Sequence, residues 1–354
     1  MFDMKRRAFI TLLGGAAVAW PRAARAQQGE RMRRIGVLML YPENDPQGQL
    51  RATAFRQGLE KLGWSVGRNV QIDFQWGLGD ANWIRSAAAR LLRLAPDVIL
   101  ANGSPAARTM QQSSRTVPVI FIAGSDPVAD GLVPSLAHPG GNLTGLYVFD
   151  PSLGAKLLEL LKEVAPYVNR VAILFNPDAN PASWSASAVA AAPRFAVEVV
   201  PSPLRDSNEI EAAMAQWGRE SNYGLIVLPD PATNAHRKLI NELAARHRLP
   251  VIHALRAAAA EGGLISYGVD LPDLFRQAAA YADRILKGDK PTNLPVQLPT
   301  KFELVINLKT AKALPHGAAV ADRYRRRGDR MIAPIKRREL FVSFLSPSNG
   351  HFLH

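Results

Sequence analysis

The chain has 354 residues, a formal net charge of +13 at pH 7 and no cysteine. The missing cysteines exclude disulfides, a thiolate nucleophile and cysteine metal ligands. A chain of this length suits two domains of ordinary size.

The positive charge is concentrated at the two ends of the chain. Residues 1–28 carry five Lys/Arg and one acidic residue, and residues 315–354 carry eight Lys/Arg and three acidic residues. The rest of the chain carries 30 Lys/Arg and 26 acidic residues. The dense basic run from Arg323 to Arg330 has one aromatic residue, Tyr324, and not the repeated aromatic interleaving of a single-strand-binding groove. We therefore expect no binding to nucleic acid.

Residues 1–26 have the three parts of a secretory signal peptide. Lys5-Arg6-Arg7 is a basic start, Ala8–Trp20 is apolar, and Ala24-Arg25-Ala26 is a small-residue cleavage signal. Arg6-Arg7-Ala8-Phe9-Ile10 also resembles the twin-arginine signal of bacteria, so we expect Tat export, cleavage near Ala26 and a periplasmic protein. The alternative is an N-terminal anchor, but the apolar run is well short of the roughly 20 residues that a span needs.

Short apolar runs alternate with amphipathic segments through the first half of the chain. Phe55, Leu59 and Leu62 share one face of a predicted helix that Gly63 ends. The expected helices are Gln49–Leu62, Trp83–Leu94 and one that opens at Ser104-Pro105, with Ser104 as its cap. The expected strands are Ile35–Leu40, Val70–Phe74, Val98–Ala101 and Val119–Ala123.

The same alternation restarts after a glycine-rich joint at Gly140–Gly145. Expected helices are Leu153–Val164, Asp206–Trp217, His236–Arg246, Leu274–Leu286 and Leu308–Leu314. Expected strands are Val171–Phe175, Val197–Val200, Leu225–Leu228, Val251–His253 and Leu264–Tyr267, followed by a linker to Pro299 and a short apolar run, Phe302–Ile306. Two such cycles predict an α/β protein of two Rossmann-like lobes with parallel sheets and a ligand cleft between them.

The sequence lacks the common signatures of catalysis. It has no phosphate-binding loop, no Gly-x-Gly-x-x-Gly after a strand and no His-Glu-x-x-His, and Asn102-Gly103-Ser104-Pro105 is not a nucleophile elbow. We therefore expect no enzymatic activity, no cofactor and no metal site.

Polar loops after the apolar strands are the candidate binding residues. Hydroxyl, amide and carboxylate groups at helix starts can hold ligand carboxylates or ammonium groups, and Asp126, Asp178 and Asp230 can equally serve as helix caps alone. Ser104 is open to the same two interpretations, a cap alone or a cap that also binds the ligand. The candidate ligand-binding residues are Tyr41, Ser104, Ser125, Asp126, Asn176, Asp230 and Tyr267.

Several motifs resemble one family. They are the leader Lys5–Gln28, Phe55–Leu59, Asp126-Pro127-Val128, Gly131–Leu136, Pro139–Gly145, Gly263–Gly268 and Pro299–Lys312. Together they resemble the rhizobial-type ABC transporter substrate-binding proteins, which are related to tryptophan- and tyrosine-binding components. The resemblance implies a type I periplasmic-binding-protein fold, with three crossovers between the lobes and a solute bound by hinge closure.

The resemblance also implies a division of the chain. We expect an N-terminal lobe over residues 30–145, completed by about 270–314, and a C-terminal lobe over residues 146–268. Relatives often have an acidic or aromatic residue where this chain has the segment His253–Ala258. This departure weakens the inference that the chain shares the amino-acid specificity of those relatives. Residues 315–354 depart from the family ending, and we interpret them as a frameshifted, poorly ordered basic tail; a genuine extension that binds anionic surfaces is the alternative.

These observations predict the periplasmic solute-binding component of an ABC importer. The solute is a small polar compound, either an amino acid or another carboxylate or aromatic compound, and the partner is an inner-membrane permease. We expect a monomer. The alternative is a periplasmic ligand-sensing protein that feeds a membrane receptor without transport.

Overall fold

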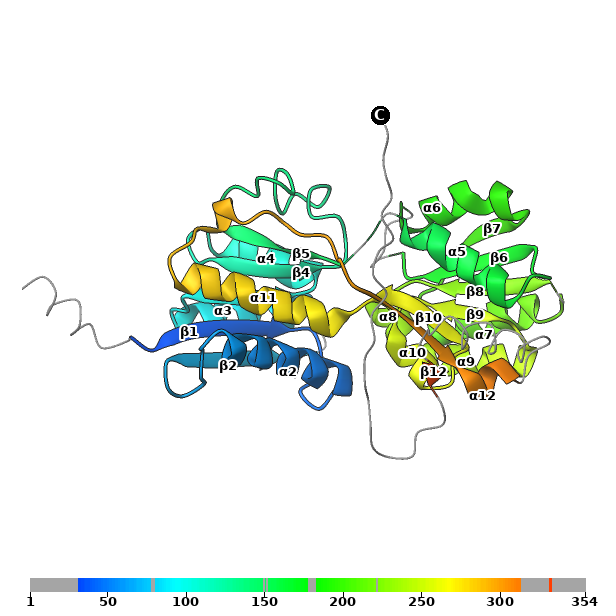
Figure 1. Cartoon of the computed structure of the whole chain (residues 1–354), viewed down its shortest axis with the longest axis horizontal. Helices are drawn as coiled ribbons and strands as arrows, with labels where there is room; N and C mark the ends of the chain where they lie inside the picture. The colour runs from blue at the N-terminus through cyan, green and yellow to red at the C-terminus, as the bar shows by residue number, and fades with distance from the viewer. Residues whose placement is uncertain are drawn as a thin grey trace, which may run out of the picture.

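The computed structural model describes residues 31–77, 80–148, 150, 152–177, 183–220, 222–312 and 331–332. The predicted signal peptide and all of the predicted aberrant tail except Met331–Ile332 lie outside the described residues. The described part forms two lobes that lie side by side, each built on its own sheet (Figure 1).

The first lobe is built on a five-stranded parallel sheet in the order β2-β1-β3-β4-β5. Its strands are β1 (Arg33–Met39), β2 (Val70–Trp76), β3 (Val98–Asn102), β4 (Val119–Ala123) and β5 (Leu143–Tyr147). Its helices are α2 (Pro46–Lys61), α3 (Ala81–Arg93), α4 (Ser104–Ser113) and, from much later in the chain, α11 (Leu271–Leu286).

Helices cover both faces of this sheet, which explains its continuous apolar strands. Ile35 and Val37 of β1 pack in one core with α2 and α11, whereas Leu38 packs in another with α3 and α4. This division follows the alternation of side chains along a strand. Asp45 caps α2 by accepting hydrogen bonds from the backbone N–H groups of Gln47 and Gly48, both at 2.8 Å.

The second lobe is built on a seven-stranded sheet in the order β12-β11-β10-β9-β8-β6-β7. Every pair is parallel except β10 with β11. Its strands are β6 (Arg170–Phe175), β7 (Glu198–Pro203), β8 (Tyr223–Val227), β9 (Val251–His253), β10 (Ile265–Val269), β11 (Phe302–Asn307) and β12 (Met331–Ile332). Its helices are α5 (Leu153–Val164), α6 (Ser183–Ala191), η1 (Ala192–Phe195), α7 (Ser207–Trp217), α8 (Pro231–Ala235), α9 (Arg237–His247), α10 (Arg256–Ala260) and α12 (Leu308–Lys312).

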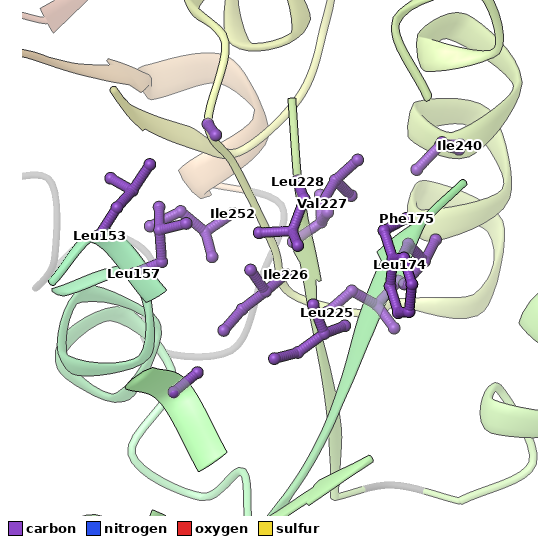
Figure 2. Close-up of a cluster of buried hydrophobic side chains, with 14 of the residues drawn as sticks. Leu153, Leu157, Leu174, Phe175, Leu225, Ile226, Val227, Leu228, Ile240 and Ile252 are labelled. Atoms are coloured by element: carbon purple, nitrogen blue, oxygen red, sulfur yellow. The ribbon is translucent and has the colours of Figure 1, made fainter. Parts of the chain in front are cut away.

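The core of the second lobe lies between its sheet and the helices on either side. Figure 2 shows Leu153 and Leu157 of α5 on one side of the strands and Ile240 of α9 on the other. Leu225, Ile226 and Val227 of β8, and Leu228 after it, lie between them. All of these side chains are at most 4% exposed. Burial of this apolar surface is the main stabilising contribution to the lobe.

Three segments connect the lobes: the chain from β5 to α5, Asp270 between β10 and α11, and the chain from Gln297 to β11. The second and third lie against each other, since the backbone N–H of Asp270 donates to the Lys301 carbonyl at 3.0 Å. Asp270 is 3% exposed, and its carboxylate lies 2.9 Å from Lys301 Nζ. The third also runs beside β5, where Tyr147 N donates to the Gln297 carbonyl at 2.8 Å.

The structure differs from the expected lobe division at the end of the chain. We expected residues 270–314 to complete the first lobe, but only α11 and the chain up to Gln297 lie against it. β11 pairs with β10 in the second sheet, and α12 follows it there. Met331–Ile332, within the tail that we expected to be poorly ordered, pairs with Ile306 and Asn307 of β11.

In the part of the chain that the structure describes, no helix is both long and apolar enough to cross a membrane.

Candidate solute-binding site between the lobes

The carboxyl ends of the parallel strands in the two lobes face each other. In Figure 1, β1 runs toward the second lobe, and α8, which follows β8, lies on the side of the second lobe nearest the first. Because parallel strands end at one edge of their sheet, the loops after β1, β3 and β4 form one wall. The loops after β6, β8 and β9 form the opposite wall.

Ser104 and Ser125 meet on the first-lobe wall. The Ser125 hydroxyl is hydrogen-bonded to Ser104 Oγ at 2.6 Å and to the carboxylate of Asp130, and Ser125 N donates to Ser104 Oγ at 3.2 Å. Asp130 in turn lies 3.3 Å from the guanidinium of Arg108. Ser104 is not the cap that we predicted, because Gly103, at φ 97°, occupies the N-cap position and Ser104 is the first residue of α4.

Asp126 and Tyr147 complete this end of the wall. Asp126 is exposed, and its carboxylate accepts hydrogen bonds from the N–H groups of Val128 and Ala129, at 2.8 and 3.2 Å. Tyr147 is 5% exposed; burial, followed by the charges of Asp126 and Asp130, raises the pKa of its phenol. The phenol therefore stays protonated. Arg108 balances one of the two carboxylates, and the remaining negative charge at this end of the wall suits an ammonium group.

Tyr41 lies at the other end of the same wall with an arginine on its ring. Arg51 is 6% exposed, and its Cζ lies 4.4 Å from the Tyr41 ring centroid. A Cβ atom on Gly48 would lie 2.9 Å from Tyr41 Cβ and 3.2 Å from Trp76 Cζ3. Glycine at position 48 therefore lets both aromatic side chains pack closely on the first turn of α2.

Asp230 joins two loops of the second-lobe wall. It is 6% exposed, and its carboxylate accepts hydrogen bonds from Thr233 N at 2.7 Å and Asn176 N at 3.0 Å. The Thr233 hydroxyl completes a capping box at the start of α8. Burial raises the pKa of Asp230, and the backbone N–H groups partly offset that rise. This carboxylate thus holds the loop after β6 against the loop after β8.

A buried polar pair supports the same wall from behind. His253, the last residue of β9, is 2% exposed, and its Nε2 lies 2.9 Å from Asn241 Oδ1. Asn241 donates its amide to the Ala258 carbonyl, which leaves Oδ1 to accept from His253. Burial lowers the pKa of His253 to about 3, so the ring is neutral at pH 7.

Tyr267 lies apart from the two groups described above. Its ring stacks on Phe302 at a centroid distance of 5.6 Å, in a surface pocket on the second lobe that Asp150, Lys156 and Glu159 also line. Burial, and then the charges of Asp150 and Glu159, raise the pKa of its phenol. This pocket adjoins the first and third connections between the lobes.

The predicted site residues thus fall into four groups. Ser104, Ser125 and Asp126 lie together, Asn176 contacts Asp230, Tyr41 lies at the far end of the first wall, and Tyr267 lies in the flanking pocket. The prediction missed Arg51 and Tyr147. Arg51 lies on the same helix face as the buried Phe55 and Leu59. A charged residue at such a core position is visible in the sequence and could have pointed to Arg51.

Among the described residues, no group of three or more His, Asp or Glu side chains is arranged to hold a metal ion.

The fold is that of type I periplasmic binding proteins. A family model for the ABC transporter substrate-binding proteins matches residues 43–317. The tyrosine-binding protein of Clostridioides difficile (strain R20291) is 29% identical over 269 residues, which are 76% of this chain and 77% of that protein.

Two solved structures are similar over most of their length. A domain from Streptococcus pneumoniae in complex with L-Trp is 25% identical with a TM-score of 0.70, over 79% of this chain and 94% of that one. The ligand-free, open structure of a substrate-binding protein with adhesive properties from Clostridium difficile is 27% identical with a TM-score of 0.65, over 80% and 94%. The family match covers most of the sequence and both lobes, and the chain therefore belongs to the ABC transporter substrate-binding proteins.

Proposed function

We propose that this chain is the periplasmic solute-binding component of an ABC import system. The observation that carries the proposal is the pairing of two polar walls: Ser104, Ser125 and Asp130 on the first lobe, and Asn176 and Asp230 on the second. The solute is a small polar compound, either an amino acid or another carboxylate or aromatic compound. The relatives named for tyrosine and solved with L-Trp support this class.

Binding proceeds by closure of the lobes about their three connections, which brings the second wall onto a solute held by the first. The closed monomer then presents its solute to an inner-membrane permease. The chain supplies binding and orientation and catalyses no reaction. Export by the twin-arginine route delivers it to the periplasm already folded.

A thermal-shift screen of amino acids and aromatic acids tests the binding. A solute at 100 times its Kd is expected to add about 2.7 kcal/mol to the free energy of unfolding. Replacing both Ser104 and Ser125 with Ala should lower the affinity for that solute by about tenfold or more, since each lost hydrogen bond to a charged group costs about 1.5–3 kcal/mol. Ser113→Ala, at the other end of α4, is the control and should bind normally. Equal affinity in the double variant would place the solute elsewhere.

The export route has its own test. Arg6→Lys together with Arg7→Lys should leave the precursor in the cytoplasm, because the Tat receptor reads the arginine pair. Both residues lie outside the described part of the chain. Fractionation that finds an unchanged periplasmic yield would show that export uses another route.

Sensing without transport is the second candidate function, because a closed solute complex can equally be read by a membrane receptor. Uptake of radiolabelled solute by a deletion strain distinguishes the two. Lost uptake that returns with the wild-type gene supports import, and normal uptake with a lost transcriptional response supports sensing.

A further inference from the structure

Arg51 carries a charge that no described residue of the first lobe neutralises. Its side chain is 6% exposed, yet among the described residues its guanidinium has no carboxylate partner and no hydrogen bond. Its contact is the ring of Tyr41, 4.4 Å from Cζ. The cation–π contact leaves the N–H donors of the guanidinium without an acceptor among the described residues, and its nitrogens are not fully buried, so a ligand can reach them.

The neighbouring carboxylates are already engaged. Asp45 accepts the N–H groups of Gln47 and Gly48 as the cap of α2. Asp130 pairs with Arg108, and Asp126 accepts two N–H groups of its own turn. β4 also stands two strands away from β1, or about 10 Å at the usual strand spacing. Among the described residues, none of these three carboxylates is therefore a counterion of Arg51.

The guanidinium lies where a solute would reach it. Tyr41 follows β1 by two residues, and Trp76, the last residue of β2, packs on the same turn of α2. Both strands end at the edge that faces the second lobe, and β1 is next to β3, the strand that leads to Ser104. Arg51 and Ser104 thus belong to one wall, with the positive charge at the β1 end and the negative charges at the β4 end.

We propose that Arg51 is the carboxylate-binding residue of the solute site. The guanidinium pairs with a carboxylate of the solute through two parallel N–H···O bonds, and the Tyr41 ring holds the guanidinium in position. This inference rests on the proposed function and defines its ligand class: the solute is an organic acid or a zwitterion. The corresponding amide or amine, which has no carboxylate, binds poorly.

Calorimetric titration of the mature protein with matched ligand pairs tests the assignment. The probes are L-tyrosine with L-tyrosinamide and L-tryptophan with tryptamine. Wild type should prefer each acid by about tenfold or more, and Arg51→Met should lose that preference by weakening the acids alone. Arg56→Met is the matched control, because Arg56 lies on the same helix with its Cζ 4.4 Å from the Phe74 ring but is exposed. It should keep the preference.

Stability separates a binding arginine from a structural one. Arg51→Met should melt near the wild-type temperature without ligand, because Arg51 makes no ion pair or side-chain hydrogen bond among the described residues, and should lose the ligand-induced shift. If Arg51→Met does not fold, Arg51→Lys is the second variant; it keeps the charge but not the paired bonds, and should lose about tenfold in acid affinity. Acids that bind wild type and either variant equally overturn the inference and leave the proposed function intact. Failure of every acid in the thermal-shift screen to bind wild type overturns both.

Discussion

His253 shows how burial of a single residue sets a pH dependence. Its pKa is about 3 in the folded chain and about 6.5 in an unfolded one, so the unfolded state binds the extra proton. The neutral ring therefore contributes stability that is complete above pH 6.5 and is lost as the pH falls toward 3.

We predict that the free energy of unfolding decreases between pH 6.5 and pH 4 with a slope of up to about 1.4 kcal/mol per pH unit from this residue. His253→Gln should flatten that slope even if it lowers stability at pH 7. Urea titrations at several pH values measure it, and His138→Gln, at an exposed position, is the control. An unchanged slope in His253→Gln would assign the pH dependence to other groups.

Asp230 illustrates why a site residue is hard to assign from sequence. A strand followed by Pro229-Asp230-Pro231 predicts a carboxylate at the sheet edge, and the structure places one there. The sequence does not reveal that this carboxylate accepts N–H groups from two separate loops, because Asn176 is 54 residues away. The burial of this carboxylate argues that its loss would lower stability as well as binding.

We therefore predict that Asp230→Ala lowers the free energy of unfolding by about 1.5–3 kcal/mol in the absence of ligand. The loss arises because Thr233 N and Asn176 N are left without their acceptor. Chemical denaturation measures it, with Asp126→Ala as a control at an exposed cap. A stable variant that fails to bind would instead mark Asp230 as a direct ligand contact.

The pairing of α2 with α11 is the element-scale feature that joins distant parts of the chain. A Cβ atom on Gly58 would lie 2.7 Å from Ala279 Cβ and 3.2 Å from Arg276 Cα. The glycine in this helix interior therefore allows two backbones to approach, which outweighs its poor helix propensity. The three nearest atoms all belong to α11, so the need for glycine at position 58 comes from this later helix.

We predict that Gly58→Val destabilises the protein by about 1–3 kcal/mol, because the added methyl groups force α2 away from α11. Gln57→Ala, on the exposed face of α2, should change little. Thermal denaturation compares the two variants. A neutral Gly58→Val would show that the helices can separate without loss of packing.

Periodicity predicted most of the other elements, since buried strands and amphipathic helices have local signatures. Periodicity did not predict β5. In this strand the Thr144 hydroxyl donates to the Leu294 carbonyl at 2.5 Å, and a Cβ on Gly145 would lie 2.1 Å from the Phe121 carbonyl oxygen. Both contacts are long-range. It predicted the apolar run of β11 but not its sheet, because such a run does not specify its pairing partner.

At the scale of the whole molecule, the two-lobed α/β fold is confirmed, whereas the fate of the tail stays a prediction. We predict that trypsin cuts first between Arg323 and Arg330 and leaves a body that still binds solute. Ending the chain after Leu314 should change the melting temperature little, because β12 adds two residues at a sheet edge. A large fall, or a protease-resistant tail, would mark residues 315–354 as a selected structural element.

The contact between Asp270 and Lys301 has a mechanical consequence for lobe movement. A backbone hydrogen bond of 3.0 Å and a buried ion pair of 2.9 Å fasten the second and third connections into one strap. Sliding one of these connections past the other would have to break the strap. We therefore expect the two connections to bend together in any rotation of the lobes.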